Sequence, residues 1–588
     1  MRLIPLSVSI PPSKTFFSKT TKRSSCRRSF SCRKNRFFSI GDFHCNRGLL
    51  AYIIGCIALS NFAFAQEDAW VYFKDKPNAE SYLSNPTTML SQRALNRRNV
   101  QNIALDQKDI PLSPSYTAQI KAAAGITVMA KSKWLNALHV RGTVQSIRAL
   151  STLPFVNNID FADRSLNARY GLNPVVHNKT TTTKATKSNT GTTADFNYGN
   201  ASNQIQMLNG HLLHQQNFTG AGKIIAVLDA GFPGVDVAAP FQRLRDNNLL
   251  LGGYNYVNRN TNIYALNRHG TLVLSTMGGY VENQLIGTAP DASYYLFITE
   301  DAASENPVEE SYWVEAAEAA DSLGVDIINT SLGYYGYDKP QYSYNYSTAI
   351  NGTTSFISRG ADIAFSRGMI VVVSAGNSGN QSENHIGVPA DAFHVLTVGA
   401  VDASRQYASF SSIGPTADGR VKPDVVAKGE AATIADASGM ITTASGTSLS
   451  APIMAGMVAC LWQALPTKTN AEIVQLIKQS ADRFASPTDH LGYGIPNFAN
   501  ALQGISSVQT NKIENRPYPN PFQNQIAIIS NTTDNTTFYL FNNLGQLVLS
   551  ETVQKTSQIF DTAQLSEGIY FYKIAGGSSV KSGKLIKR

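Results

Sequence analysis

Short apolar runs rich in Val and Ile recur between residues 200 and 505, and they constrain the fold of this 588-residue chain more than any other feature. Continuous apolar runs of this length are typical of strands that are buried on both faces, as in a parallel sheet covered by helices. The four clearest runs are Lys223–Asp229, Val325–Asn329, Met369–Ser374 and Val395–Ala400.

Longer segments around these runs are predicted to form crossover helices, namely Ser311–Leu323, Ser355–Arg367 and Ser448–Leu465. Strands that alternate with helices favour an α/β fold with a doubly wound, mostly parallel sheet in a three-layer αβα arrangement. We expect this domain to span residues 201–505. A chain of this length is expected to hold three or four domains, so the regions outside 201–505 are predicted to fold separately.

Ser448 stands where a glycine-bearing stretch turns into the last of these helices, with Pro452 expected inside the first turn. At a helix N-terminus the unpaired amide groups and the helix dipole favour negative charge that develops nearby. The hydroxyl of Ser448 is therefore a candidate nucleophile. A plain N-cap serine on a core helix is the alternative that this segment alone leaves open.

Three further polar residues of the domain stand among small residues. Asp229 ends the first apolar run, and crevice sites form at the carboxyl ends of strands in open α/β sheets. His269 opens a small-residue helix, and its imidazole could take a proton from a serine and return it to a leaving amine. Asn377 follows the third run and could donate its amide to an oxyanion. Considered singly, a capping aspartate, a packing histidine and a turn asparagine remain alternatives.

The order Asp229, His269, Asn377 and Ser448, each in a glycine-rich setting, resembles the subtilisin-like serine peptidases, the subtilases. The resemblance implies a subtilisin-like fold and a secreted serine endopeptidase that works through an acyl-enzyme. It makes Ser448 the nucleophile, His269 the general base and then acid, and Asp229 the carboxylate that orients the imidazole. Asn377 would be the oxyanion donor, together with the backbone N–H of Ser448.

The same resemblance implies which residues bind the substrate. Ser331, Leu332 and Gly333 match the segment that lines the specificity pocket in this family and pairs with the peptide as an added strand. Ala375 and Gly376, directly before the oxyanion asparagine, are expected to contact the substrate as well.

Two departures from the family pattern stand out. Leu449 and Ser450 follow the serine where relatives often carry methionine and alanine, a change that should leave the turn intact. The stretch Thr299–Glu310 holds five acids where relatives carry a glycine-rich substrate-binding edge. These acids could attract basic peptide residues or a cation, or the stretch could be a solvated loop.

Other functions find less support in the sequence. No H-E-x-x-H motif occurs, and His211-Leu212-Leu213-His214 lacks the intervening acid and a visible third ligand of a zinc site. The segment around Ser448 is not the G-x-S-x-G elbow of the α/β-hydrolase esterases. A catalytically silent binding or adhesion protein of the same fold is the remaining alternative. Catalysis is expected to need no cofactor, and structural calcium, which subtilases often bind, has no assigned site here.

A secretory signal peptide is predicted within residues 1–65, where a basic segment precedes the apolar run Leu49–Ala65. Cleavage is expected after Ala65, a membrane anchor is the weaker alternative because the run is short, and the long basic segment suggests a true start further downstream. The pI near 9.1 arises from this leader, which holds 11 Lys and Arg and one acid, so no nucleic-acid partner is expected. Four of the five cysteines also lie there, which leaves Cys460 and no intramolecular disulfide after processing.

The region after the leader fits the same resemblance. Residues 66–165 mix strand and helix patterns and resemble an inhibitory, folding-assisting propeptide, so the protein is expected to be made as a zymogen. Residues 166–200 are expected to form a flexible, cleavable linker, because the threonine-rich run Thr180–Thr193 has almost nothing to bury.

The last module spans residues 506–588, and its alternating segments predict a small β-sandwich. With Pro519-Asn520-Pro521 early and Gly583–Arg588 at its end, the module is similar to the type IX secretion sorting domain of Bacteroidetes. A carbohydrate-binding or adhesive sandwich is the alternative. We therefore expect a secreted or surface-attached protein whose partners are a protein or peptide substrate, its own propeptide and the secretion machinery.

Overall fold

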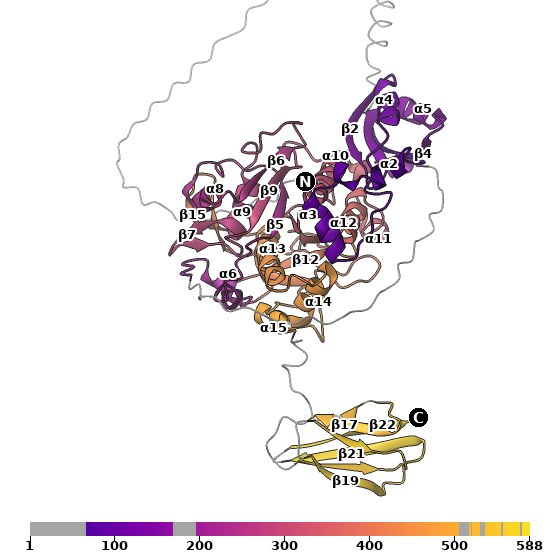
Figure 1. The fold of residues 1–588 in the computed structure, drawn as a ribbon, viewed down its shortest axis with the longest axis vertical. Coiled ribbons are helices and arrows are strands. Elements are labelled where there is room, and N and C mark those ends of the chain that lie inside the picture. Colours follow the sequence, from indigo (N-terminus) through magenta and orange to yellow (C-terminus); the bar gives the residue numbers. More distant parts are fainter. Residues whose placement is uncertain are drawn as a thin grey trace, which may run out of the picture.

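The computed structural model describes residues 66–167, 196–504 and 517–588, the last range with gaps at 519, 530–535, 554–556 and 577–578. These parts are called here the N-terminal, central and C-terminal domains (Figure 1). The expected signal peptide, the leader cysteines and most of the expected linker lie outside the described residues. Within the described ranges, no helix combines the length and the hydropathy that a membrane span requires.

The central domain is built on a seven-stranded sheet, in the order β13-β12-β11-β10-β5-β9-β6. Its strands are β5 (Ile224–Asp229), β6 (Leu250–Asn255), β9 (Ser293–Ile298), β10 (Ile327–Thr330), β11 (Ile370–Ser374), β12 (Leu396–Val401) and β13 (Val425–Lys428). Every neighbouring pair is parallel. Each of the four apolar runs forms one strand of this sheet, which confirms the predicted α/β fold.

Two layers of helices cover the sheet, α9 (His269–Gly278) and α13 (Thr447–Ala464) on one face, α10 (Val308–Leu323) and α12 (Phe356–Ser366) on the other. Successive side chains of a strand point to opposite faces. On β5, Ile225 and Val227 accordingly belong to the core shared with α9 and α13, whereas Ala226 and Leu228 belong to the core shared with α10 and α12. Strands that are apolar on both faces thus require helices on both faces.

Shorter elements complete the central domain around this frame. They are α6 (Ser202–Gln206), α7 (His211–His214), α8 (Gln242–Asp246), β7 (Tyr280–Val281), β8 (Leu285–Ile286), α11 (Tyr346–Ala349), β14 (Ala432–Ala435), β15 (Ile441–Ala444), α14 (Asn470–Ser480) and α15 (Phe498–Gln503), with the 3₁₀ turns η4 (Ala239–Phe241) and η5 (Pro340–Tyr342).

The N-terminal domain is a four-stranded antiparallel sheet in the order β2-β3-β1-β4 with short helices. Its elements are β1 (Glu67–Phe73), α2 (Ala79–Leu83), η1 (Pro86–Thr88), α3 (Gln92–Val100), α4 (Pro114–Ala122), β2 (Ile126–Ser132), β3 (Ala137–Gly142), α5 (Val144–Ala149), η2 (Leu150–Thr152), β4 (Val156–Phe161) and η3 (Arg164–Leu166). The mixed strand and helix patterns expected for residues 66–165 are thus both present in this domain.

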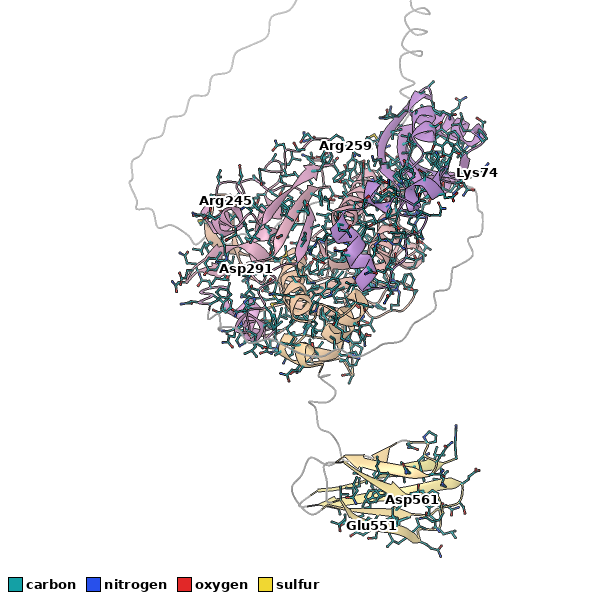
Figure 2. All side chains as sticks on the ribbon, viewed as in Figure 1. Lys74, Arg245, Arg259, Asp291, Glu551 and Asp561 are labelled. Carbon is teal, nitrogen blue, oxygen red and sulfur yellow. The ribbon has the colours of Figure 1, made fainter. Side chains whose placement is uncertain are left out.

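The N-terminal sheet packs on α10 and α12 of the central domain. The indole of Trp70 stacks on Phe356 with ring centroids 5.2 Å apart, and its N–H donates to Ser311 Oγ at 2.8 Å. Trp70 and Trp134 belong to the same apolar core as the two helices. Arg259 lies at the margin of the central domain nearest this sheet (Figure 2), where it pairs with Glu315 at 2.8 Å and donates to the carbonyl of Met129.

A separate part of the N-terminal domain, residues 91–101, reaches along the central domain and is called the arm (Figure 1). Its helix α3 carries Arg97 and Arg98, both buried. Arg98 Nη2 lies 2.8 Å from Asp321 Oδ2 and 2.9 Å from Asp109 Oδ1, and Arg97 also binds Asp321. Two arginines of one domain therefore hold a fully buried carboxylate of the other.

The C-terminal domain consists of two antiparallel sheets, β16-β17-β20 and β19-β18-β21-β22. The strands are β16 (Pro517–Tyr518), β17 (Gln525–Ile529), β18 (Thr536–Phe541), β19 (Leu547–Val553), β20 (Ser557–Asp561), β21 (Gly568–Gly576) and β22 (Ser579–Lys587). Ile526 and Phe560 of the first sheet share one buried core with Phe538 and Leu585 of the second. This agrees with the expected small sandwich.

Candidate active site

The four residues singled out for catalysis lie where the chain leaves strands of the sheet or enters a helix. Asp229 is the last residue of β5, and Asn377 follows β11 in a short loop. His269 is the first residue of α9, and Ser448 is the second residue of α13. The carboxyl ends of parallel strands meet at one edge of a sheet, and that edge is where open α/β sheets form their ligand crevices.

Asp229 and His269 are joined directly. His269 Nδ1 lies 2.7 Å from Asp229 Oδ1, which also accepts the N–H of Ala230 at 2.7 Å. Both side chains are buried. Burial lowers the pKa of His269, but the charge and hydrogen bond of Asp229 outweigh it, and the pKa lies above its ordinary value. The contact fixes Nδ1 as the protonated ring nitrogen and leaves Nε2 as the basic one.

His269, Asn377 and Ser448 line one cavity of about 580 Å³. Ser448 is 6% exposed and His269 8% exposed, so the groups are reached through the cavity rather than from open surface. Because Ser448 lies in the first turn of α13, its backbone N–H is among the amides at that helix end which lack a helical partner. An acidic, a basic and a hydroxyl group are thus assembled beside free amide donors.

The amide of Asn377 has a defined orientation. Its Oδ1 accepts the backbone N–H of Thr447 at 2.8 Å and the hydroxyl of Thr447 at 2.7 Å. Two donors at one oxygen identify it as the carbonyl end of the amide and leave Nδ2 as the end available to the cavity. Sequence reasoning missed Thr447, although its place directly before the candidate nucleophile was a usable signal.

Pro452 lies deeper in α13 than the expected first turn. Proline has no N–H, so the carbonyl of Ser448, four residues earlier, lacks its helical donor. The hydroxyl of Ser331 donates to that carbonyl instead, at 2.9 Å. The proline therefore lets the segment after β10 bind directly to the residue that carries the candidate nucleophile.

Of the five residues expected to bind substrate, Ser331, Gly333, Ala375 and Gly376 line the cavity. Leu332 does not line it, because its side chain is 2% exposed and packs in the core with α10 and α12. In an extended segment successive side chains point to opposite sides. Leu332 therefore anchors the segment while its two neighbours face the cavity.

The acidic stretch Thr299–Glu310 is not a solvated loop, since Glu300, Glu305, Glu309 and Glu310 are all buried. Glu310 accepts the hydroxyl of Tyr337 at 2.6 Å and the N–H of Ile357 at 3.0 Å, and Glu309 accepts backbone N–H groups of the stretch itself. These two carboxylates therefore have a structural role, because their hydrogen bonds connect segments of the central domain.

Carboxylates also stand in the wall of the cavity. Glu305 is the acid of that stretch that lines it, beside Asp338 and Glu383 from other loops. The lining residues include two histidines and no Lys or Arg. The cavity therefore carries an excess of negative charge.

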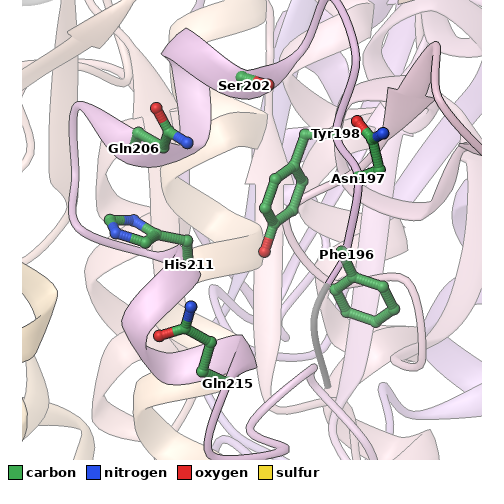
Figure 3. A pocket seen from close by; sticks show the side chains of 7 residues that line it. All are labelled: Phe196, Asn197, Tyr198, Ser202, Gln206, His211 and Gln215. Atoms are coloured by element: carbon green, nitrogen blue, oxygen red, sulfur yellow. The ribbon is translucent and has the colours of Figure 1, made fainter. Parts of the chain in front are cut away.

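A second cavity, of about 350 Å³, is lined by Phe196, Asn197, Tyr198, Ser202, Gln206, His211 and Gln215 (Figure 3). None of the predicted catalytic residues lines it.

His214, the other histidine of the H-L-L-H segment, is buried between Tyr198 and the carbonyl of Thr288, and burial lowers its pKa to about 4. Cys460 packs beside it as a buried free thiol. In the described part of the chain, no three His, Cys, Asp or Glu residues are grouped as metal ligands.

Three protein-family models match the chain in succession. A model described as "Peptidase S8 propeptide domain, Bacteroidota" matches residues 68–184, "Subtilase family" matches residues 220–496, and "Secretion system C-terminal sorting domain" matches residues 516–588. The order of the three matches is the order of the three described domains.

Similar curated proteins are bacterial peptidases. Subtilisin NAT of Bacillus subtilis subsp. natto is 31% identical over 303 residues, which cover 51% of this chain and 70% of that protein. Subtilisin of Bacillus pumilus is 30% identical over 303 residues, 51% of this chain and 98% of that protein. Serine protease AprX of Bacillus subtilis (strain 168) is 29% identical over 320 residues, 49% of this chain and 68% of that protein.

Proposed function

This chain belongs to the subtilase family as a subtilisin-like serine endopeptidase, and from this premise we propose that it cleaves peptide bonds through an acyl-enzyme formed on Ser448. The observation that carries the proposal is the Asp229–His269 contact of 2.7 Å, with His269, Asn377 and Ser448 in one cavity. A buried carboxylate, an oriented imidazole and a hydroxyl are the groups that acyl transfer to serine requires.

In the proposed reaction, Ser448 Oγ attacks the carbonyl carbon of the scissile bond while Nε2 of His269 takes the hydroxyl proton. The C–N bond then breaks as the imidazolium returns that proton to the leaving amine. Water attacks the ester with the same histidine as base, which releases the acid and restores the serine. Asp229 holds the ring in the required tautomer and stabilises the imidazolium.

The negative oxygen of the tetrahedral intermediate needs donors that are in place before the reaction. Nδ2 of Asn377 is the free end of an amide fixed by Thr447, and the N–H of Ser448 points from the start of α13. We assign these two groups as the oxyanion donors. One such donor typically contributes about 10²- to 10³-fold to kcat.

The protein carries a propeptide domain and a secretion sorting domain, and it is secreted or attached to the cell surface. We propose that the N-terminal domain inhibits the enzyme until the linker is cut. Support comes from its broad docking on α10 and α12 and from the arm. The sorting domain would then be the part that the secretion machinery recognises. The proposed reaction requires no cofactor, and we assign no calcium site.

The test compares the secreted protein with its Ser448→Ala variant in two assays, labelling by a fluorophosphonate probe and casein cleavage. The parent is expected to be labelled and to cleave casein, and the variant to do neither. Labelling or cleavage that survives in the variant would overturn the assignment of Ser448. A parent that folds but shows neither activity would instead support the silent binding protein.

A further inference from the structure

Glu300 is a buried carboxylate beside the Asp229–His269 pair. Strands β5 and β9 are parallel neighbours in which Asp229 pairs with Ile298, and the N–H of Thr299 donates to the carbonyl of Asp229 at 3.0 Å. Glu300 is two residues beyond the partner of Asp229. Alternate residues of an extended segment point to the same side, so this register brings Glu300 to the side on which Asp229 lies.

Hydrogen bonds satisfy only one of the two carboxylate oxygens of Glu300. Glu300 is 3% exposed, and its Oε1 accepts the hydroxyl of Tyr334 at 2.7 Å and that of Thr299 at 3.0 Å. Its Oε2 and Oδ2 of Asp229 are buried without a hydrogen-bond partner among the described residues. Burial of such groups is costly, and each of the two carboxylates thus keeps one oxygen whose charge no donor among the described residues offsets.

We propose that Glu300 is a positioning residue of the peptidase, whose buried negative charge stabilises the imidazolium form of His269 and so sets the pH at which His269 becomes a base. The proposal rests on the function proposed above for His269. Glu300 does not touch the reacting atoms in this role. It acts through His269, because its negative charge adds to that of Asp229, the carboxylate that orients the ring.

The groups that face Glu300 support this assignment. They are Asp229 at the end of β5, His269 on α9, Tyr334 after β10 and Glu309 on α10. Burial raises the pKa of Glu300 to about 7, against the hydrogen bonds of Tyr334 and Thr299 that lower it. The charge of Glu300 in turn raises the pKa of His269. Burial thus favours the neutral carboxyl of Glu300, and wherever Glu300 is ionised its charge favours the protonated ring of His269.

An anion near His269 favours the protonated ring, so removal of that anion lets the ring lose its proton at lower pH. Glu300→Gln keeps the size of the side chain and removes the charge. We expect the acid limb of the kcat/KM profile to move to lower pH by roughly one unit, with the plateau within a few-fold of the parent.

The experiment measures kcat/KM against pH for the parent, Glu300→Gln and the control Glu315→Gln, which removes a partly exposed carboxylate of α10 paired with Arg259. The control is expected to keep the parent profile. A second readout is the titration of the His269 ring by NMR in the Ser448→Ala chain, with and without Glu300→Gln. It needs no turnover and is expected to show the same shift to lower pH.

If neither the acid limb nor the ring titration moves in Glu300→Gln, the inference fails. If the parent hydrolyses nothing, the proposed function fails, while the ring titration still decides the role of Glu300. A uniform loss of rate at every pH, with an unmoved titration, shows a merely structural residue. Should Glu300→Gln not fold, Tyr334→Phe decides, because it removes the donor that favours ionised Glu300 and should move the titration the same way by less.

Discussion

Thr447 and Asn377 are joined by two hydrogen bonds, in which the backbone N–H and the hydroxyl of Thr447 both donate to Oδ1 of Asn377, at 2.8 and 2.7 Å. The residue before the proposed nucleophile thereby orients the proposed oxyanion donor. The same hydroxyl accepts the N–H of Gly376 at 3.1 Å, which ties the loop after β11 to the start of α13. Thr447 thus binds Asn377 and directly precedes Ser448, the two residues that supply the proposed oxyanion donors.

Thr447→Val keeps the shape of the side chain and removes the hydroxyl. We expect kcat to fall by roughly tenfold with little change in KM, since a less fixed amide stabilises the oxyanion less well. Steady-state kinetics on a peptide substrate measure both constants. The matched control is Thr442→Val on β15, which should keep the parent values. An unchanged kcat in Thr447→Val would show that the backbone N–H alone orients Asn377.

Asn377→Ala removes the proposed side-chain donor itself. We expect kcat to fall by about 10²- to 10³-fold, because the transition state loses one charge-assisted hydrogen bond. KM should change little, since the ground-state carbonyl needs that donor less. The measurement is steady-state kinetics of purified enzyme, with circular dichroism to check that the fold is intact. A drop of less than threefold would be incompatible with an oxyanion role.

Arg98→Ala leaves the fully buried Asp321 with one arginine of the arm instead of two. Loss of one partner of a buried ion pair typically costs about 3–5 kcal/mol, so the free energy of unfolding should fall by that order. Urea unfolding of the Ser448→Ala chain, which avoids self-cleavage, measures the change. Lys121→Ala removes an exposed charge of the same domain and serves as the control. Equal stability of the two variants would show that the ion pairs of Arg98 contribute nothing to the stability of the fold.

Asp424 should make stability depend on pH in the acid range. Its carboxylate lies 2.6 Å from Lys422 Nζ and 2.7 Å from Lys478 Nζ. Burial raises the pKa of Asp424, but the two lysines outweigh it and hold the pKa at about 2. A lowered pKa stabilises the fold at pH values above the unfolded value near 4, and this stabilisation is lost as the pH falls toward 2. Thermal unfolding should show a deficit in Asp424→Asn at pH 7 that shrinks below pH 4; a constant deficit would contradict this origin.

The acids of the cavity wall should favour basic side chains in the peptide. Glu305 and Glu383 line the cavity of the proposed nucleophile, and no Lys or Arg lines it. We expect cleavage of a peptide library to be enriched in Lys or Arg near the scissile bond. Glu305→Gln and Glu383→Gln should each reduce that enrichment several-fold, whereas Glu430→Gln on the exposed surface should not. A library profile without any basic preference would refute the expectation.

The sequence predicted the sheet and the positions of the proposed catalytic residues because both depend on local patterns. Apolar runs such as Met369–Ser374 predict buried strands, and a polar residue that directly follows one lies at the carboxyl edge of the sheet. This reasoning placed Asp229 and Asn377 correctly relative to their strands.

What the sequence left open depends on contacts between distant segments. The burial of Glu300 requires Tyr334 on another strand connection, and the docking of the arm requires Asp321, more than 200 residues away in the chain. The sequence of an acidic stretch such as Thr299–Glu310 does not show whether its carboxylates face water or accept hydrogen bonds from buried tyrosines. The orientation of Leu332 into the core likewise follows from the path of the segment after β10, which no local pattern specifies.

Trp70 and Trp134 of the N-terminal domain lie in the apolar core that covers one face of the central sheet. A core that is shared cannot be lost from one side alone without exposing the other side to water. The two domains are therefore expected to unfold as one cooperative unit while they remain on one chain, and calorimetry of the Ser448→Ala chain should record a single transition for both. The propeptide and subtilase family models match separate stretches of the chain, but the two domains are expected to share one unfolding transition.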